Sequence, residues 1–285
     1  MTATPARGLI ALLRLPYWMM TGGLSLITAF AITKELIGFD NIFLIFFSMA
    51  CITSAGFSIN DYYDRESDAV IKPKRPIPSG ALSLKQVIAI AAILFTVGLT
   101  LAFLINWLSF LILIVDCILL VIYSAFVKRK SGFAANVLVG LLVGTAFLYG
   151  EATVSQNISL ISVSLYPICF GTIGGNILRD ILSFEGDSQI GYPTLPKKIG
   201  NKGSIQIAAF FFIATALLAP LPFLFQFFSI YYMSLITLWS ILLVYSSIRL
   251  VTSQPTVENV KKYERLITMS MMLLILSLII EAVAA

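Results

Sequence analysis

The chain has 285 residues, of which 59% are hydrophobic and only 12% carry a charge, and its mean hydropathy is +0.95. This composition excludes an ordinary soluble globular domain and indicates an integral membrane protein. The formal net charge of +5 comes from bases spread through short polar segments, so it does not predict nucleic-acid binding. The absence of histidine and the three isolated cysteines argue against zinc and against a disulfide framework.

Nine apolar segments are each long enough to cross, as a helix, the roughly 30 Å hydrocarbon core of a bilayer. They lie at 15–33, 41–60, 84–104, 107–127, 133–150, 158–180, 205–225, 229–250 and 265–284. No linker-like or low-complexity stretch separates them. We therefore predict an all-α, polytopic membrane protein in which residues 1–285 form a single domain.

The basic residues fall on one side of this arrangement. Of the 19 Lys and Arg residues, all but Lys34 lie in or beside the segments that nine crossings place on the same face. Short loops rich in Lys and Arg stay in the cytoplasm. We therefore expect a multi-pass protein of the cell membrane whose N-terminus and charged loops are cytoplasmic and whose C-terminus is outside.

The most polar stretch, residues 60–80, reads NDYYDRESDAVIKPKRPIPSG. Asp61, Asp64 and Asp68 are spaced i, i+3, i+7, so a helix presents all three carboxylates on one face, here called the acidic stripe. Asn60 joins this face one turn before Asp64. Like charges at these spacings repel, so we expect cations to face them. Bases follow on a proline-rich segment that can fold back over the stripe, at Lys72, Lys74 and Arg75.

A second polar stretch, residues 177–200, reads ILRDILSFEGDSQIGYPTLPKKIG. Asp180, Ser183 and Asp187 repeat the spacing of the acidic stripe with serine in the middle place, and bases such as Lys197 follow again. The two stretches end the second and sixth spans, so they emerge on the same side of the membrane. The pattern is typical of a weak internal repeat in which two related halves place a site between them.

Two carboxylate clusters at one face, each followed by bases, suit a polyanion that is bound through divalent cations. Mg²⁺ takes oxygen ligands, and phosphate oxygens commonly complete its coordination. Lys and Arg side chains then neutralise the remaining charge. A diphosphate held between the clusters by Mg²⁺ is the simplest interpretation, and Tyr123 and Lys128 offer further donors on the same side.

Two further acids lie away from these clusters. Asp116 falls inside the fourth span, where an ionisable group costs on the order of 3 kcal/mol. It either serves the function or hydrogen-bonds within the bundle, and both interpretations stay open. Glu151, at the opposite face, is expected to be a solvated loop residue.

The pattern from Asn60 to Asp68, NDxxDxxxD, resembles the first signature of the UbiA-type intramembrane prenyltransferases. Asp180 through Asp187, followed by GYPTLP at 191–196, resembles the second, and the resemblance extends over essentially the whole chain. It implies nine transmembrane helices that enclose a central cavity, with both motifs on the cytoplasmic side. It also implies transfer of a prenyl group from a prenyl diphosphate to an acceptor inside the membrane.

The same resemblance implies a role for each site residue. Mg²⁺ is the implied cofactor, and its implied ligands are Asp61, Asp64, Asp68, Asp180 and Asp187. The expected catalytic residues are Asp64, Asp68, Asp180 and Asp187. The expected diphosphate-binding residues are Asn60, Lys72, Arg75, Tyr123, Lys128 and Lys197. Metal and cationic groups stabilise the departing diphosphate in such a site, while an apolar chamber keeps water from the allylic carbocation.

Within the family, the segment KPKRPIPSG resembles members that add a second geranylgeranyl chain to geranylgeranylglyceryl phosphate in archaeal ether-lipid synthesis. The implied partners are a prenyl diphosphate donor, a lipid-phosphate acceptor and membrane lipid. Those members usually carry acids where Ser183 and Leu182 stand, and the form found here is closer to chlorophyll synthase-like members.

The acceptor therefore has alternatives, namely a chlorophyll synthase-like or an aromatic one. A cation-coupled transporter is an alternative of a different class, because carriers also use intramembrane acids and internal repeats. Against it, the acids of this chain cluster at one face rather than at the midplane.

Overall fold

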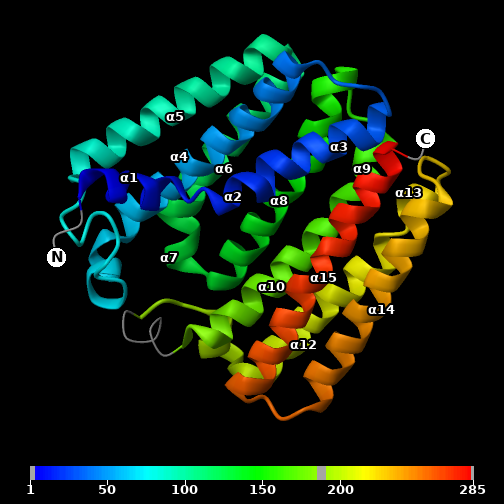
Figure 1. Cartoon of the computed structure of the whole chain (residues 1–285). Helices are drawn as coiled ribbons and strands as arrows, with labels where there is room; N and C mark the ends of the chain where they lie inside the picture. Colours follow the sequence, from blue (N-terminus) through cyan, green and yellow to red (C-terminus); the bar gives the residue numbers. More distant parts are fainter. Residues whose placement is uncertain (1–3, 185–190, 284–285) are drawn as a thin grey trace.

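The computed structural model describes residues 4–184 and 191–283, and in this part of the chain every regular element is a helix (Figure 1). Nine helical segments in it are long and apolar enough to cross a membrane, as predicted. They are Pro5–Thr33, Phe39–Ile71, Leu84–Ile105, Trp107–Lys130, Gly132–Ser155, Leu160–Leu182, Leu195–Leu224, Ile230–Thr252 and Val257–Val283. The chain is therefore a multi-pass membrane protein.

The first span is broken near its start. It consists of α1 (Pro5–Leu13), α2 (Pro16–Trp18), the π-helical η1 (Met19–Gly23) and α3 (Leu24–Thr33). Arg14 ends α1 in the left-handed region at φ 50° and ψ 53°. Pro16 follows, and proline has no backbone N–H with which to continue the hydrogen bonds of α1. The predicted span at 15–33 is therefore preceded by a separate short helix.

The long helices that follow are α4 (Phe39–Ile71), α5 (Leu84–Ile105), α6 (Trp107–Ile122), α8 (Gly132–Ser155), α10 (Cys169–Leu182), α12 (Leu195–Leu218), α14 (Ile230–Thr252) and α15 (Val257–Val283). Short elements between them are η2 (Tyr123–Val127), α7 (Lys128–Lys130), α9 (Leu160–Leu165), η3 (Tyr166–Ile168) and α13 (Leu221–Leu224).

Several helices extend beyond the predicted spans. α4 continues past residue 60 to Ile71, and α15 begins at Val257 rather than at 265. α12 begins at Leu195 rather than at 205, but it is kinked at Gly200, where φ is 74° and ψ is 171°. Hydrophobicity marks where a helix meets hydrocarbon, whereas its backbone hydrogen bonds continue into the polar region until a breaker ends them. The acidic stripe therefore belongs to a continuous helix rather than to a loop.

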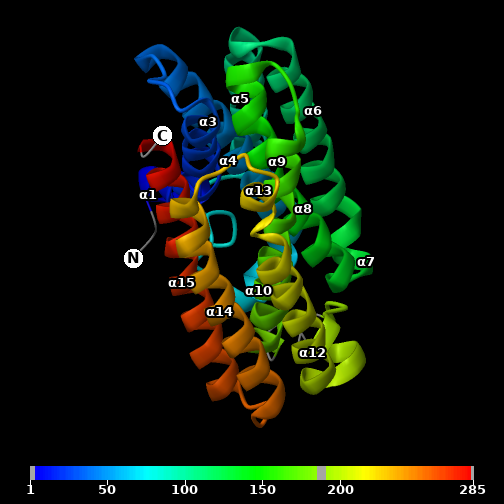
Figure 2. The same cartoon turned by 90° about the vertical axis from the view of Figure 1, so that its right-hand side faces the viewer.

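The helices form two packing units. α4, α5 and α6 surround one apolar core that includes Ile45, Met49 and Leu113, while α10, α12, α14 and α15 surround a larger one that includes Phe212 and Trp239. α3 and α8 pack against each other and against both units. Figures 1 and 2 show α5 and α6 on one side of the molecule and α12, α14 and α15 on the other.

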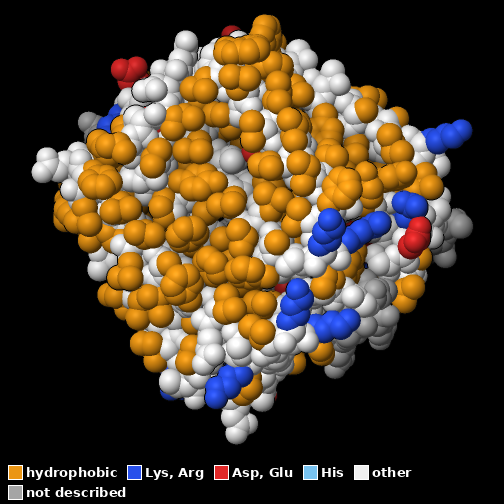
Figure 3. All heavy atoms as spheres, turned by 180° about the vertical axis from the view of Figure 1, so that it is seen from behind, with side chains coloured by type: hydrophobic (Ala, Val, Ile, Leu, Met, Phe, Trp, Pro, Cys, Tyr) orange, Lys and Arg blue, Asp and Glu red, His pale blue; other side chains and the backbone are white. Residues whose placement is uncertain are grey.

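The contact between α3 and α8 depends on a glycine. A Cβ atom on Gly150 would lie 2.6 Å from the carbonyl oxygen of Ser25, closer than real side chains approach. Small residues of this kind let membrane helices pack with their backbones in close contact. The outer surface is apolar: hydrophobic side chains cover most of the face shown in Figure 3, and Lys and Arg side chains gather toward one side of it.

The expectation for Glu151 was wrong. Its side chain is only 2% exposed and lies in α8. It accepts hydrogen bonds from the Ser159 backbone N–H at 2.9 Å, from the Ser159 hydroxyl at 2.6 Å and from the Ser162 hydroxyl. Ser159 is the N-cap of α9. Glu151 therefore holds the start of the next helix instead of facing water.

Glu281 repeats this arrangement in the other packing unit. The side chain is 0% exposed, and one carboxylate oxygen accepts from the backbone N–H and hydroxyl of Ser229, the N-cap of α14, at 2.9 and 2.5 Å. The other oxygen lies 2.9 Å from the ammonium group of Lys34. A single carboxylate thus ties α15 to the ends of α3 and α14.

Glu281→Gln is expected to lower the free energy of unfolding by about 2 kcal/mol. Glutamine keeps the side-chain volume, but it loses the charge that forms the ion pair with Lys34 and strengthens the hydrogen bonds from Ser229. Glu35→Gln is the control, since Glu35 is exposed nearby in the same connecting segment as Lys34. Thermal unfolding of the detergent-purified variants measures the difference. Equal unfolding midpoints for wild type and Glu281→Gln would contradict this role.

Candidate active site

The acidic stripe forms on α4 as its spacing predicts. Asp61, Asp64 and Asp68 are all buried, although they lie in the last turns of the helix. Burying a carboxylate is costly unless it is paired or hydrogen-bonded. Each of the three is indeed met by at least one cationic side chain, and the three sets of partners come from different parts of the chain.

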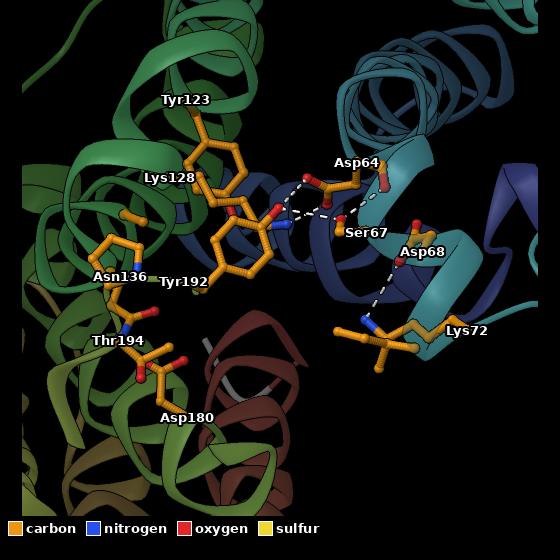
Figure 4. A pocket seen from close by; sticks show the side chains of 14 residues that line it. Asp64, Ser67, Asp68, Lys72, Tyr123, Lys128, Asn136, Asp180, Tyr192 and Thr194 are labelled. Atoms are coloured by element: carbon orange, nitrogen blue, oxygen red, sulfur yellow. Dashed lines mark hydrogen bonds and ion pairs between the residues drawn. The ribbon is translucent and has the colours of Figure 1, made fainter. Parts of the chain in front are cut away.

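A pocket opens between the end of α4 and the facing ends of α8 and α10 (Figure 4). It encloses about 710 Å³, including space that is open to solvent. Its lining residues are Asp64, Ser67, Asp68, Ile71, Lys72, Tyr123, Lys128, Gly132, Ala135, Asn136, Asp180, Tyr192, Pro193 and Thr194. The predicted clusters of the two polar stretches therefore contribute carboxylates to one cavity.

Asp64 has several hydrogen-bonding partners in and beside the pocket. Its Oδ2 pairs with the Lys128 ammonium and accepts from the Asn60 amide at 2.9 Å. Its Oδ1 accepts from the Tyr192 hydroxyl at 2.7 Å (Figure 4). Burial raises the pKa of the Tyr192 hydroxyl, so the group keeps its proton at neutral pH and acts as a donor.

Lys128 reaches Asp64 from a distorted part of the fourth span. Residues Tyr123–Val127 form the π-helical turn η2 directly before it. Such turns inside α-helices are frequent at functional sites because they change the direction of the side chains that follow. Tyr123 and Lys128, which the sequence analysis expects to bind diphosphate, both line the pocket.

The other two pocket carboxylates lie on opposite sides of the cavity (Figure 4). Asp68 is 3.9 Å from the ammonium group of Lys72, one turn further along the chain. Asp180, near the end of α10, accepts a hydrogen bond from the Asn136 amide at 2.7 Å. Asp187, another predicted ligand, lies outside the described residues.

Asp61 does not line the pocket. Its Oδ1 accepts from Arg14 at 2.6 Å and from Arg75 at 2.8 Å, and the side chain is 2% exposed. Two guanidinium groups therefore occupy the oxygen of an expected metal ligand. Arg75, expected to bind diphosphate, is used in this cluster, and Lys197 is likewise not a pocket-lining residue.

Tyr192 and Asn136, which donate hydrogen bonds to pocket carboxylates, were not among the predicted site residues. Tyr192 belongs to the GYPTLP segment, but an isolated tyrosine gives no signal because aromatic residues are common at membrane interfaces. Asn136 carries a usable signal, since an amide near the start of an otherwise apolar span needs a polar partner. Asp116 lines no part of this pocket; it is buried in α6 and accepts a hydrogen bond from Thr145 at 2.8 Å.

The charges of the lining residues restrict what the pocket can bind. Among the described residues, three carboxylates and two ammonium groups line it, which is an excess of one negative charge. A phosphate-containing anion alone is repelled by such a site, whereas a divalent cation reverses the sign. Within the described ranges, three acidic, cysteine or histidine side chains do not come close enough together to form a complete metal site by themselves. The pocket thus suits a cation whose coordination an anionic ligand completes.

Comparisons with known proteins agree with this geometry. The sequence pattern of the UbiA prenyltransferase family matches residues 19–275. Digeranylgeranylglyceryl phosphate synthase of Natronomonas pharaonis is 35% identical over 218 residues, which are 76% of this chain and 78% of that relative.

Solved structures agree as well. The fold matches a structure of digeranylgeranylglyceryl phosphate synthase with a TM-score of 0.85 and 28% identity, covering 99% of both chains. It also matches a UbiA homolog from Archaeoglobus fulgidus bound to DMAPP and Mg²⁺, with a TM-score of 0.69 and 18% identity over 95% of this chain and 98% of that one. This nine-span chain, with both acidic motifs contributing to one pocket, belongs to the UbiA prenyltransferase family.

Proposed function

We propose that the chain transfers a geranylgeranyl group from geranylgeranyl diphosphate to geranylgeranylglyceryl phosphate, and that all of residues 1–285 serve this one activity. In this reaction the bond between the allylic carbon and the diphosphate oxygen breaks, and its electron pair leaves with diphosphate. The acceptor hydroxyl oxygen bonds to the allylic carbon and loses its proton. One observation carries the proposal: carboxylates of α4 and α10 face each other across a pocket that also holds Lys72 and Lys128.

The choice of acceptor follows from the relatives. Curated sequences at 30–38% identity, over 61–84% of this chain, are digeranylgeranylglyceryl phosphate synthases. Their acceptor carries a phosphate and an isoprenoid chain, and both suit a polar pocket at the end of an apolar bundle. This favours a lipid-phosphate acceptor over the chlorophyll-like and aromatic acceptors, despite the serine at position 183.

Mg²⁺ is the cofactor we infer, and the donor set fits it. Asp64, Asp68 and Asp180 supply hard oxygen ligands from two helices to one pocket. The excess negative charge of the lining also calls for a cation before a diphosphate can enter. When bound, Mg²⁺ draws electron density from the diphosphate and makes it a better leaving group.

The protein's own groups have complementary tasks. Lys128 donates to Asp64, and the ammonium group of Lys72 lies 3.9 Å from Asp68, so both ammonium groups are placed to donate to diphosphate oxygens once those enter. Tyr192 and Tyr123 add neutral donors at the same rim. Ile71 and Ala135 line the pocket with apolar surface, where exclusion of water protects a developing allylic cation.

The orientation in the membrane is part of the proposal. The bases around the pocket make its end of the bundle the cytoplasmic one by the positive-inside rule. A water-soluble diphosphate headgroup can then reach the pocket from the cytoplasm while its isoprenoid chain stays in lipid.

A transfer assay tests the proposed function. Purified protein in lipid nanodiscs is expected to convert labelled geranylgeranyl diphosphate and geranylgeranylglyceryl phosphate into a doubly prenylated lipid phosphate, with the activity lost in EDTA and restored by Mg²⁺. Asp64→Asn should abolish transfer, because it removes a charged oxygen ligand from the pocket lining. Glu66→Gln, on the same helix but with an 86% exposed side chain, should retain it. Transfer to chlorophyllide or a hydroxybenzoate instead of the lipid phosphate would overturn the acceptor assignment.

Tyr192→Phe is expected to lower kcat/KM for the donor about tenfold, because one hydrogen bond to a charged carboxylate is worth about 1.5 kcal/mol or more. The substitution removes only the hydroxyl that bridges to Asp64. Tyr245→Phe, on the exposed surface of α14, is the matched control. Steady-state kinetics at saturating Mg²⁺ measure the effect, and unchanged kinetics for Tyr192→Phe would show that the bridge has no role in transfer.

A further inference from the structure

We propose that Asp61 is a positioning residue that fixes the N-terminal helix and the basic segment 72–83 against the pocket, and that it is not a metal ligand. This inference rests on the proposed function only for the identity of the donor. The observation behind it is the cluster in which Arg14, Asp61 and Arg75 meet, here called the arginine clamp.

The clamp holds Asp61 outside the set of residues that line the pocket. Asp61 lies one helical turn before Asp64, yet its exposed fraction is 2% and it is absent from the pocket lining. Both guanidinium groups bond to its Oδ1, while Oδ2 is buried without a hydrogen-bond partner among the described residues. Two positive charges against one negative charge leave the cluster cationic, and this repels a divalent ion.

Arg14 connects the clamp to the N-terminal helix. It ends α1 in the left-handed region, a conformation that costs non-glycine residues of order 1 kcal/mol or more and persists only where contacts hold it. Its guanidinium bonds to Asp61 and lies 4.2 Å from the centroid of the Phe57 ring. The interactions of Arg14 therefore fasten the end of α1 to α4.

α1 in turn packs on the far end of the basic segment. Leu12 is completely buried with Leu82 and Val87 in a small apolar cluster. Gly8 contacts Ala81 so closely that a Cβ at Gly8 would lie 2.8 Å from the Ala81 Cβ. The clamp and this cluster thus hold the segment 72–83 at both of its ends.

Arg75 connects the clamp to the pocket. Its backbone N–H donates to the carbonyl of Lys72 at 2.9 Å, so a tight turn joins the two residues. Lys72 lines the pocket and faces Asp68. Fixing Arg75 on Asp61 therefore fixes the backbone that presents Lys72 to the diphosphate. Loss of Asp61 should release this cation without removing any ligand of the metal.

Three variants of the full chain distinguish positioning from metal binding by hydrogen exchange. Asp61→Asn should accelerate exchange in both α1 and the segment 72–83. Arg14→Gln should accelerate it mainly in α1, and Arg75→Gln mainly in 72–83, because each leaves the other ion pair intact. Unchanged exchange in both segments of Asp61→Asn would overturn the clamp. If Asp61→Asn does not fold, the separate patterns of the two arginine variants decide the same point.

Metal binding supplies the second readout. With inorganic diphosphate present, Asp61→Asn should bind Mn²⁺ within about twofold of wild type, whereas Asp64→Asn should bind it at least about tenfold more weakly, since it loses a charged oxygen ligand. Equal weakening in the two variants would make Asp61 a ligand and overturn the proposal.

Kinetics then separate this inference from the proposed function. Asp61→Asn should raise KM for geranylgeranyl diphosphate about tenfold, because one charge-assisted contact to the donor is released. The Mg²⁺ concentration for half-maximal activity should stay unchanged. A raised Mg²⁺ requirement would count against positioning. If wild-type protein transfers no prenyl group, the proposed function fails, while exchange and Mn²⁺ binding still decide the role of Asp61.

Discussion

The site is built around carboxylates that are buried at one end of an apolar bundle, because their negative charge needs cationic partners. α4 places Asp61, Asp64 and Asp68 on one face, and each would be costly to bury alone. Their cationic partners come from the N-terminal arm, from the segment after α4 and from the end of the fourth span. The acids of one helix thus form ion pairs with three separate parts of the chain.

The carboxylates that line the pocket come from both packing units. α4 belongs to the first unit and α10 to the second, and α3 and α8 join them. The Asp64–Tyr192 hydrogen bond crosses the same junction, linking residues 128 positions apart. A ligand between α4 and α10 therefore contacts both units, so its binding energy is available to hold them together. Neither packing unit forms the pocket alone.

Sequence periodicity predicts local geometry well and predicts tertiary partners poorly. The helical stripe and the nine spans follow from spacing and hydrophobicity, which act over neighbouring residues. The partner of each acid depends on how the segments fold back. For this reason the sequence groups Asp61 with Asp64, although Asp61 faces Arg14 and only Asp64 lines the pocket. Glu151 was misassigned for a related reason, because its serine partners follow it in a short turn that resembles an exposed loop.

In the proposed mechanism, carboxylates of α4 and α10 together hold one metal-bound diphosphate. The most direct test is a structure determined with Mn²⁺ and an unreactive thio analogue of geranylgeranyl diphosphate, in which anomalous scattering locates the metal. Manganese is expected to lie in the pocket, with oxygen ligands from Asp64 or Asp68 on one side and from Asp180 on the other. Manganese bound to one of the two helices only, or a diphosphate bound outside this pocket, would contradict it.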